Sequence, residues 1–210
     1  SYTDTLGNGV GESQATANYA IDGVDPEVTS IGFADTTMIA GDTPTLTIVF
    51  TEAVAAFASN DDVTCQNGAL AVMTSSDQIT WTGAFTPSAG IADDTNTCTV
   101  ADSYTDTLGN GVGESQATAN YEIETTIPTS SVTGISDTSL IEGDTAVITI
   151  VLSEANAGFT NDDVVCANGA LGALSTGDGL TYTGTFTPTA DVSDDSNTCV
   201  VGTSWTDTAG

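Results

Sequence analysis

The chain repeats itself, and this repetition constrains its fold more than any other feature of the sequence. Residues Pro26 to Tyr104 align with Pro128 to Trp205 at an offset of 102 positions, which falls to 101 after a one-residue deletion near Phe159. Three pairs of blocks match in order: AGDTPTLTIVFTEAV with EGDTAVITIVLSEAN, NDDVTCQNGAL with NDDVVCANGAL, and ITWTGAFTP with LTYTGTFTP. A period of about 100 residues is long enough for each copy to form its own hydrophobic core. The sequence therefore predicts two tandem domains of one fold.

The sequence begins and ends inside a repeat. The opening stretch SYTDTLGNGVGESQATANYAI returns at 103–123 with one change, Ala20 to Glu122. We interpret residues 1–22 as the C-terminal strand region of a preceding repeat, 23–124 as a complete repeat, and 125–210 as a repeat lacking its last strand. Either the chain is a window from a longer array, or its first segment is a donor strand that completes a neighbouring subunit. The final SWTDTAG overlaps the opening seven residues, which favours the window.

Hydrophobic residues alternate with polar ones within each repeat, as they do in half-buried β-strands. Leu46, Ile48 and Phe50 lie on one face of a predicted strand, and Ile148, Ile150 and Leu152 repeat them. Asn-Gly and Asp-Gly pairs predict hairpin turns at 67–68, 168–169 and 178–179. About seven short strands per 100 residues indicate an all-β fold of tandem immunoglobulin-like antiparallel β-sandwiches.

The charge of the chain excludes several classes of partner. It has 29 acidic residues and no Lys, Arg or His, so its net charge is -29. Nucleic acid and anionic membrane surfaces need cationic side chains and are not expected partners. No run approaches the 18 or more apolar residues of a membrane span, so membrane insertion is not expected in this segment. Cations must come from solution, which indicates bound divalent metal or high ambient salt.

Four cysteines, Cys65, Cys98, Cys166 and Cys199, occupy equivalent places in the two repeats, and each pair is 33 positions apart. Four cysteines allow three pairings, and the repeat favours Cys65–Cys98 and Cys166–Cys199. No CxxC motif or His accompanies them, so structural disulfides formed in an oxidising compartment are expected. Cys65 shares a strand face with Val63, and Cys98 shares one with Val100, so both thiols should point into the core. We expect the bridge to join the third and sixth strands, which are neighbours in immunoglobulin-like sandwiches.

The repeated blocks resemble the bacterial Ig-like repeats of giant extracellular adhesins and surface fibre proteins. The matching elements are GDT…TIVFTEAV…F, NDDV…NGAL, ITWTGAFTP, and YTDTLGN…ATANYAID leading into the next repeat. This resemblance covers the whole chain. It implies an extracellular, calcium-rigidified rod that projects, attaches or builds a fibre. The cysteine pairs depart from many relatives, which carry aliphatic residues at such core positions.

Acidic residues gather at the predicted domain ends. In such a sandwich, the start of the first strand, the loop after the second strand and the loop before the last strand meet at one end. Calcium takes six to eight oxygens from carboxylates, carbonyls and water, and similar sites in the family lie at junctions. The alternative is that these are solvated turn residues whose carboxylates cap backbone amides. The candidate ligands for structural calcium are Asp22, Glu52, Asp61, Asp62, Asp106, Glu124, Glu154, Asp162, Asp163 and Asp207.

These features together predict a structural or adhesive extracellular protein whose tandem Ig-like repeats form a rod, stalk or filament on a bacterial surface. The expected partners are neighbouring repeats of the same chain and identical chains in a fibre. The alternatives are a filament of short subunits joined by donor-strand complementation and a glycan-binding module that uses the exposed Thr and Asp side chains. An enzyme is not expected, because a chain without His, Lys or Arg has no ordinary catalytic triad or phosphate clamp.

Overall fold

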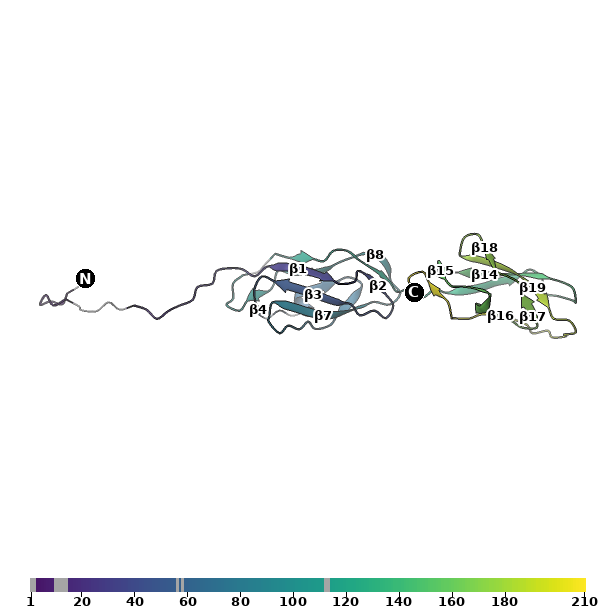
Figure 1. The fold of residues 1–210 in the computed structure, drawn as a ribbon, viewed down its shortest axis with the longest axis horizontal. Helices are drawn as coiled ribbons and strands as arrows, with labels where there is room; N and C mark the ends of the chain where they lie inside the picture. The colour runs from purple at the N-terminus through teal and green to yellow at the C-terminus, as the bar shows by residue number, and fades with distance from the viewer. Residues whose placement is uncertain (1–2, 10–14, 56, 58, 112–113) are drawn as a thin grey trace.

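The structure is a computed structural model that describes residues 3–9, 15–55, 57, 59–111 and 114–210. Two β-rich units lie end to end along the longest axis (Figure 1). We refer to residues 23–124 as the first domain, to 125–210 as the second domain, and to the residues before 23 as the N-terminal tail. The described part of this tail extends from the end of the first domain that faces away from the second domain.

Short strands make up nearly all of the first domain. Its elements are β1 (Val28–Phe33), β2 (Thr37–Ile39), β3 (Thr45–Phe50), β4 (Val54–Ala55), α1 (Ser59–Asp62), β5 (Val63–Cys65), β6 (Gly68–Leu70), β7 (Thr80–Pro87), β8 (Ala92–Asn96), β9 (Cys98–Val100), β10 (Thr105–Asp106), β11 (Gln116–Ala117) and β12 (Tyr121–Glu124).

These strands form the two layers of a β-sandwich. One layer is the antiparallel sheet β1-β3-β7-β6, and the facing layer contains β11-β9-β5 and β2-β12-β8. The short pair β4–β10 lies beside them as a separate two-stranded ladder. One pairing departs from the antiparallel expectation, because β12 runs parallel to β2 while it pairs antiparallel with β8. Parallel neighbours need a long connection, and here most of the domain lies between β2 and β12.

The predicted alternation places one face of β3 in the core. Leu46, Ile48 and Phe50 are buried, whereas the residues between them are only half-buried. Strand β12 contributes Tyr121 and Ile123 to the same core from the opposite layer. The core is therefore closed only when the last strand of the repeat is in place.

The second domain repeats this arrangement with fewer strands. Its elements are β13 (Ser130–Ile135), β14 (Ala146–Leu152), β15 (Asn156–Ala157), the 3-10 helix η1 (Asn161–Asp163), β16 (Val164–Cys166), β17 (Gly169–Leu171), β18 (Ser175–Thr176), β19 (Thr181–Pro188), β20 (Cys199–Val201) and β21 (Thr206–Asp207).

The two domains have separate cores. The sheet β13-β14-β19-β17, with β18 beside β19, faces the pair β16–β20, and β15 pairs with β21. Phe50 belongs to the buried cluster of the first domain and Phe159 to that of the second. The all-β prediction of tandem Ig-like sandwiches is thereby confirmed. Within the described residues, no helix is long and apolar enough to cross a membrane.

Both disulfides join the residues that the repeat pairs. Cys65 lies directly opposite Cys98 on the antiparallel strands β5 and β9, and Cys166 lies opposite Cys199 on β16 and β20. The bridged strands are neighbours, as expected. They are fifth and ninth in the first domain, not third and sixth, because the chain is divided into more short strands than the pattern indicates.

The prediction of a hairpin at Asn67-Gly68 is wrong. Strand β5 pairs with β9 and β6 pairs with β7, so the turn carries the chain from one layer to the other. Gly68 is required there, because a Cβ at this position would lie 2.1 Å from Cζ of the buried Phe85. The equivalent turn at Asn168-Gly169 differs from a hairpin in the same way, whereas Asp178-Gly179 does join the paired strands β18 and β19.

Candidate functional site

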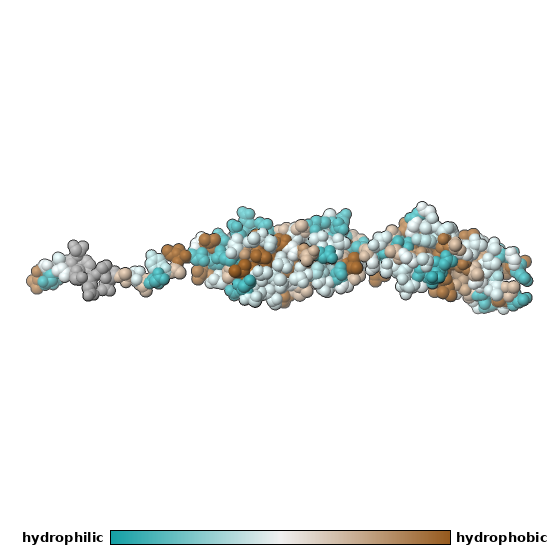
Figure 2. Space-filling view, viewed as in Figure 1, coloured by the Kyte–Doolittle hydropathy of each residue, from teal (hydrophilic) through white to brown (hydrophobic). Residues whose placement is uncertain are grey.

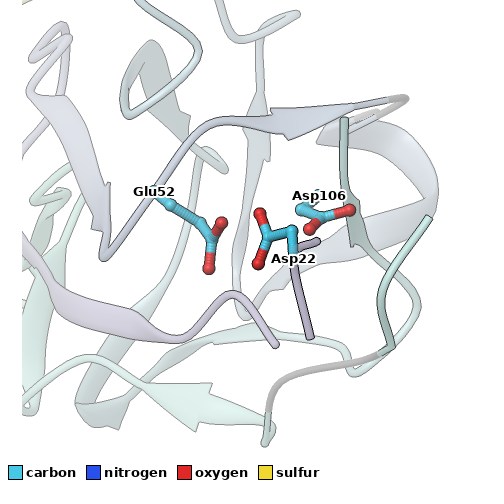
Figure 3. Close-up of side chains that lie close together, drawn as sticks. All are labelled: Asp22, Glu52 and Asp106. Carbon is cyan, nitrogen blue, oxygen red and sulfur yellow. The ribbon is translucent and has the colours of Figure 1, made fainter. Parts of the chain in front are cut away.

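Three carboxylates meet where the N-terminal tail enters the first domain. Asp22 lies at the end of the tail, Glu52 follows β3, and Asp106 belongs to β10. One oxygen from each side chain lies within 4.8 Å of the other two. Figure 3 shows the Asp22 and Glu52 carboxylates facing each other, with Asp106 beside them. We call these three residues the first acidic cluster.

A local loop holds Asp106 in place. Its Oδ1 accepts hydrogen bonds from the amides of Leu108 and Asn110, both at 2.8 Å, and its Oδ2 accepts one from Asn110 Nδ2 at 2.7 Å. Asp4 in the tail makes the same three bonds, with Leu6 and Asn8 as donors. Because the loop forms in the tail as well as in the domain, the sequence DTLGN is sufficient to specify it.

The like charges in the first acidic cluster repel one another. Partial desolvation raises the pKa of the Glu52 carboxyl, and the negative charges of Asp22 and Asp106, in that order, raise it further. The negative charge of Asp25 also raises the pKa of Glu52, by a smaller amount.

Asp106 behaves in the opposite way. Its burial works against ionisation, but the hydrogen bonds from Asn110 and Leu108 outweigh it, and the pKa of Asp106 falls below its usual value. The cluster therefore holds a firmly ionised Asp106 beside a Glu52 that is costly to ionise without a cation.

A second acidic cluster lies at the junction between the two domains, and it consists of Glu124, Glu154 and Asp207. One oxygen from each side chain again lies within 4.8 Å of the other two. Glu124 is the last residue of β12 in the first domain, whereas Glu154 follows β14 and Asp207 belongs to β21 in the second. The cluster thus brings carboxylates of both domains together.

The hydroxyl of Thr126 lies between two of these carboxylates. Glu124 Oε1 accepts hydrogen bonds from the Thr126 amide, at 2.9 Å, and from its hydroxyl. The same hydroxyl lies 3.3 Å from Glu154 Oε2. No sequence signal marks Thr126, because its counterpart at the first cluster is Val24 and the repeat does not preserve a hydroxyl there.

The linker between the domains is fixed on both sides. Thr125 is buried, and its Oγ1 donates to Ser88 O at 2.6 Å and accepts from the Ile91 amide at 3.0 Å. On the other side, the Thr129 amide donates to Ser153 Oγ at 2.8 Å. Only residues 126–128 separate these anchors, and Pro128 has a restricted φ angle. The junction is therefore short and constrained.

Four of the predicted ligands lie outside both clusters. Asp61 and Asp162 are exposed. Asp62 accepts a hydrogen bond from the Ser103 hydroxyl, and Asp163 accepts one from Ser204 Oγ at 2.5 Å. Asp163 Oδ2 also accepts from the Thr160 amide at 2.8 Å as part of a capping box. The structure gives Asp62 and Asp163 hydrogen-bonding partners within the fold, which is the turn-capping alternative.

The two clusters fit a hard divalent cation. Calcium binds carboxylate oxygens at about 2.3–2.6 Å, so two oxygens that bind one ion lie no more than about 5 Å apart. The three oxygens of each cluster lie within 4.8 Å of one another, which satisfies this condition. Each cluster carries three carboxylates, and no cationic side chain exists in the chain to offset them. In the second cluster a bound ion would join the last strand of the first domain, through Glu124, to Glu154 and Asp207 of the second domain.

A family model described as a bacterial Ig-like domain matches residues 22–123 and again 124–210. No curated protein matches the chain. The two matches meet at the second acidic cluster and cover most of the sequence, and the chain therefore belongs to the family of bacterial Ig-like domains.

Proposed function

We propose that this chain is a spacer segment of an extracellular bacterial surface protein, in which Ig-like domains are held end to end as a rod, stalk or filament and calcium fixes each junction. The observation that carries this proposal is the second acidic cluster, because its ligands come from both domains. Glu124 approaches Glu154 and Asp207 beside residues 126–128, the only part of the linker that its two anchors leave free to bend.

The same arrangement occurs at the start of the first domain. Asp22 is the counterpart of Glu124 in the repeat, and it meets Glu52 and Asp106 as Glu124 meets Glu154 and Asp207. If the domains serve to span a fixed distance, each junction between domains should carry the same acidic cluster. The disulfides support an extracellular location, since they persist in oxidising compartments.

Calcium titration tests the proposal. Isothermal titration calorimetry on the intact chain should detect two sites, one for each acidic cluster. Glu154→Gln should remove one site and leave the other, whereas Glu142→Gln, an exposed acid outside both clusters, should retain two. Absence of calcium-dependent heat together with an unchanged thermal midpoint in excess chelator would contradict the proposal.

The stiffness of the junction is measured separately. Residual dipolar couplings report whether the two domains share one alignment tensor and so move as one body. In calcium the tensors should agree for the wild type and for Glu142→Gln. In chelator, or in Glu154→Gln, they should diverge. Equal tensors under all these conditions would mean that the linker alone fixes the junction and that calcium has no role in it.

A further inference from the structure

Four asparagines of the chain are followed by glycine, and the fold places them in different environments. They are Asn8, Asn67, Asn110 and Asn168. Asparagine is among the thermolabile residues of proteins. A following glycine favours its loss, because no side chain on the glycine keeps its amide nitrogen away from the Asn carboxamide. That nitrogen displaces ammonia from the carboxamide, and water then opens the ring to a carboxylate. The surrounding contacts decide which of the four sites reacts.

The fold protects Asn67 from this reaction. Its Nδ2 donates to Asp93 Oδ2 at 2.8 Å and to Asn96 Oδ1 at 2.7 Å, so both hydrogens of the carboxamide are bonded. Gly68 begins β6 and lies against the buried ring of Phe85, where a Cβ would be 2.1 Å from Cζ. The glycine amide therefore cannot turn toward the carboxamide without breaking these contacts.

Asn168 is protected in the same way. Its Nδ2 donates to Asp194 Oδ2 at 2.9 Å and to Asn197 Oδ1 at 2.6 Å. Gly169 begins β17, and a Cβ there would lie 2.1 Å from Cζ of Phe186. Both copies of the sequence NGAL should therefore react slowly while the domains are folded.

Asn110 has a looser environment. Within the described residues its Nδ2 has one acceptor, Asp106 Oδ2 at 2.7 Å. Gly111 is exposed and belongs to no strand or helix, and its amide donates to no acceptor in the part of the chain that the structure describes. No hydrogen bond of the Gly111 amide therefore has to break before its nitrogen approaches Asn110 Cγ.

A carboxylate lies against this glycine. A Cβ at Gly111 would lie 3.0 Å from Asp25 Oδ1 and 3.4 Å from Asp25 Oδ2, and the three atoms nearest to it all belong to Asp25. The next residue in the chain, Pro26, is buried and has a restricted φ angle, which fixes the backbone beside Asp25. A carboxylate at this place is positioned to accept the amide proton whose removal makes the nitrogen nucleophilic.

We propose that Asn110 is a site of self-catalysed deamidation in which Asp25 is the base. Asp25 takes the proton from the Gly111 amide, and the nitrogen forms a bond with Asn110 Cγ. The Cγ–Nδ2 bond then breaks, and Nδ2 leaves as ammonia with the proton that Asp25 returns. Water opens the resulting succinimide at one of its two carbonyls and leaves aspartate or isoaspartate. The net reaction consumes one water, releases one ammonia and regenerates the Asp25 carboxylate.

The product acts on the loop that holds Asp106. The Nδ2 donor that meets Asp106 Oδ2 is replaced by a second carboxylate, so an attraction becomes a repulsion. Because Asp106 is one of the three residues of the first acidic cluster, deamidation loosens a ligand of the proposed calcium site. The inference goes beyond the proposed function, since the reaction itself needs no calcium.

Peptide mapping of the intact chain tests the site. The protein is incubated at neutral pH in chelator, in water enriched in ¹⁸O, and its chymotryptic peptides are analysed by mass spectrometry. Asn110 should be modified first, whereas Asn67 and Asn168 should react last. In denaturant, where no tertiary contact distinguishes the four pairs, all should react at similar rates. Preferential modification of Asn67 or Asn168 in the native protein would overturn the inference.

The N-terminal tail contains an internal reference for the role of Asp25. Asn8 makes the same hydrogen bonds within its loop as Asn110 does. A Cβ at Gly9, however, would meet no atom within 4 Å. Figure 2 shows the tail as a narrow extension outside the first domain. Asn8 therefore reports the rate of the same loop without a neighbouring base.

Removal of the base separates its effect from that of the loop. Asp25→Asn should slow the deamidation of Asn110 about tenfold, to the rate of Asn8, and leave Asn8 unchanged. This is less than the roughly hundredfold contribution of a positioned enzymatic base, because Asp25 is exposed. Glu27→Gln, which removes a nearby exposed acid and keeps Asp25, should match the wild type. Equal rates at Asn8 and Asn110 in the wild type, or an unchanged Asn110 rate in Asp25→Asn, would overturn Asp25 as the base.

Hydrogen exchange of the variant Asn110→Asp measures the effect on the loop. The Leu108 amide donates to Asp106 Oδ1 at 2.8 Å. In this variant it should exchange at least about tenfold faster than in the wild type, because a hydrogen bond to a charged group is worth at least that factor. The matched change in the tail, Asn8→Asp, should leave the Leu108 amide unchanged. Equal exchange of Leu108 in Asn110→Asp and the wild type would overturn the effect on Asp106.

Discussion

The carboxylate of Glu124, at the end of the last strand of the first domain, lies within 4.8 Å of the carboxylate of Asp207 in the second domain. Two like charges are thus brought together across a linker with only three residues between its anchors. Such an arrangement costs free energy unless a cation lies between the charges. The same balance between charge repulsion and ion binding applies to Glu52 in the first acidic cluster.

Substitution of Glu52 should change stability in opposite directions with and without calcium. In chelator at pH 7, Glu52→Gln removes a charge that the fold disfavours and should raise the free energy of unfolding. Because the folded-state pKa of Glu52 is raised, the wild type loses stability as pH rises from the ordinary Glu pKa through the folded value. The advantage of the variant should therefore vanish near pH 3.5, below the ordinary Glu pKa of about 4.3.

In saturating calcium at pH 7, Glu52→Gln should instead be less stable than the wild type, because it removes a ligand. Urea unfolding followed by fluorescence measures both effects, with Glu142→Gln as the control that should change neither. The same sign of the change under both conditions would show that Glu52 takes no part in binding calcium.

The two disulfides should differ in their resistance to reduction. In the first domain Cys98 is fully buried, and Tyr121 Oη lies 3.8 Å from its Sγ. In the second domain Cys199 is only half-buried, because no residue of the described range 114–210 takes the place of Tyr121 beside it. A limiting amount of phosphine should therefore reduce Cys166–Cys199 first.

Alkylation followed by chymotryptic mapping detects this order, since the chain has no Lys or Arg for trypsin. Complete loss of either bridge should cost roughly 3–4 kcal/mol by the entropy of the loop that it closes. In denaturant the two bridges should be reduced at the same rate. Equal rates in the native protein as well would contradict the prediction.

Replacement of Tyr121 should destabilise the first domain severely. Tyr121→Ala empties a fully buried site and leaves Gln66 O without its hydroxyl donor. The expected loss is about 3–5 kcal/mol in the free energy of unfolding. Tyr19→Ala makes the same change in the same local sequence and should stay within about 0.5 kcal/mol of the wild type in the monomer. Calorimetry of dilute samples compares the two, and similar losses would mean that the tail is packed against a domain.

Gly68→Ala should be costly for a steric reason. The new methyl group would lie 2.1 Å from Phe85 Cζ and 2.7 Å from Thr86 O, and the buried Phe85 ring has little room to move. A loss of about 1–3 kcal/mol is expected. Gly32→Ala, where a Cβ meets no atom within 4 Å, is the matched control. A neutral Gly68→Ala in chemical denaturation would show that the turn can shift away from the ring.

The sequence by itself determined the features that depend on neighbouring residues. The alternation of Leu46, Ile48 and Phe50 specified a strand with one buried face, because side chains of a strand point to opposite sides in turn. The DTLGN segment specified its loop even in the tail, because the Asp4 carboxylate reaches amides two and four residues away. The near-identity of the repeats also pointed to the paired cysteines and to acids near the junctions.

Only the tertiary structure decided which of those acids meet and where the chain crosses between layers. Asp62 and Glu52 are both acids near one end of a repeat, yet Asp62 accepts a hydrogen bond from Ser103 while Glu52 faces Asp22. Likewise Asn67-Gly68 carries a turn signal, but the partners of the adjacent strands lie far along the chain. Long-range packing sets these relationships, and it also leaves Tyr19 exposed where Tyr121, in the same sequence, is buried.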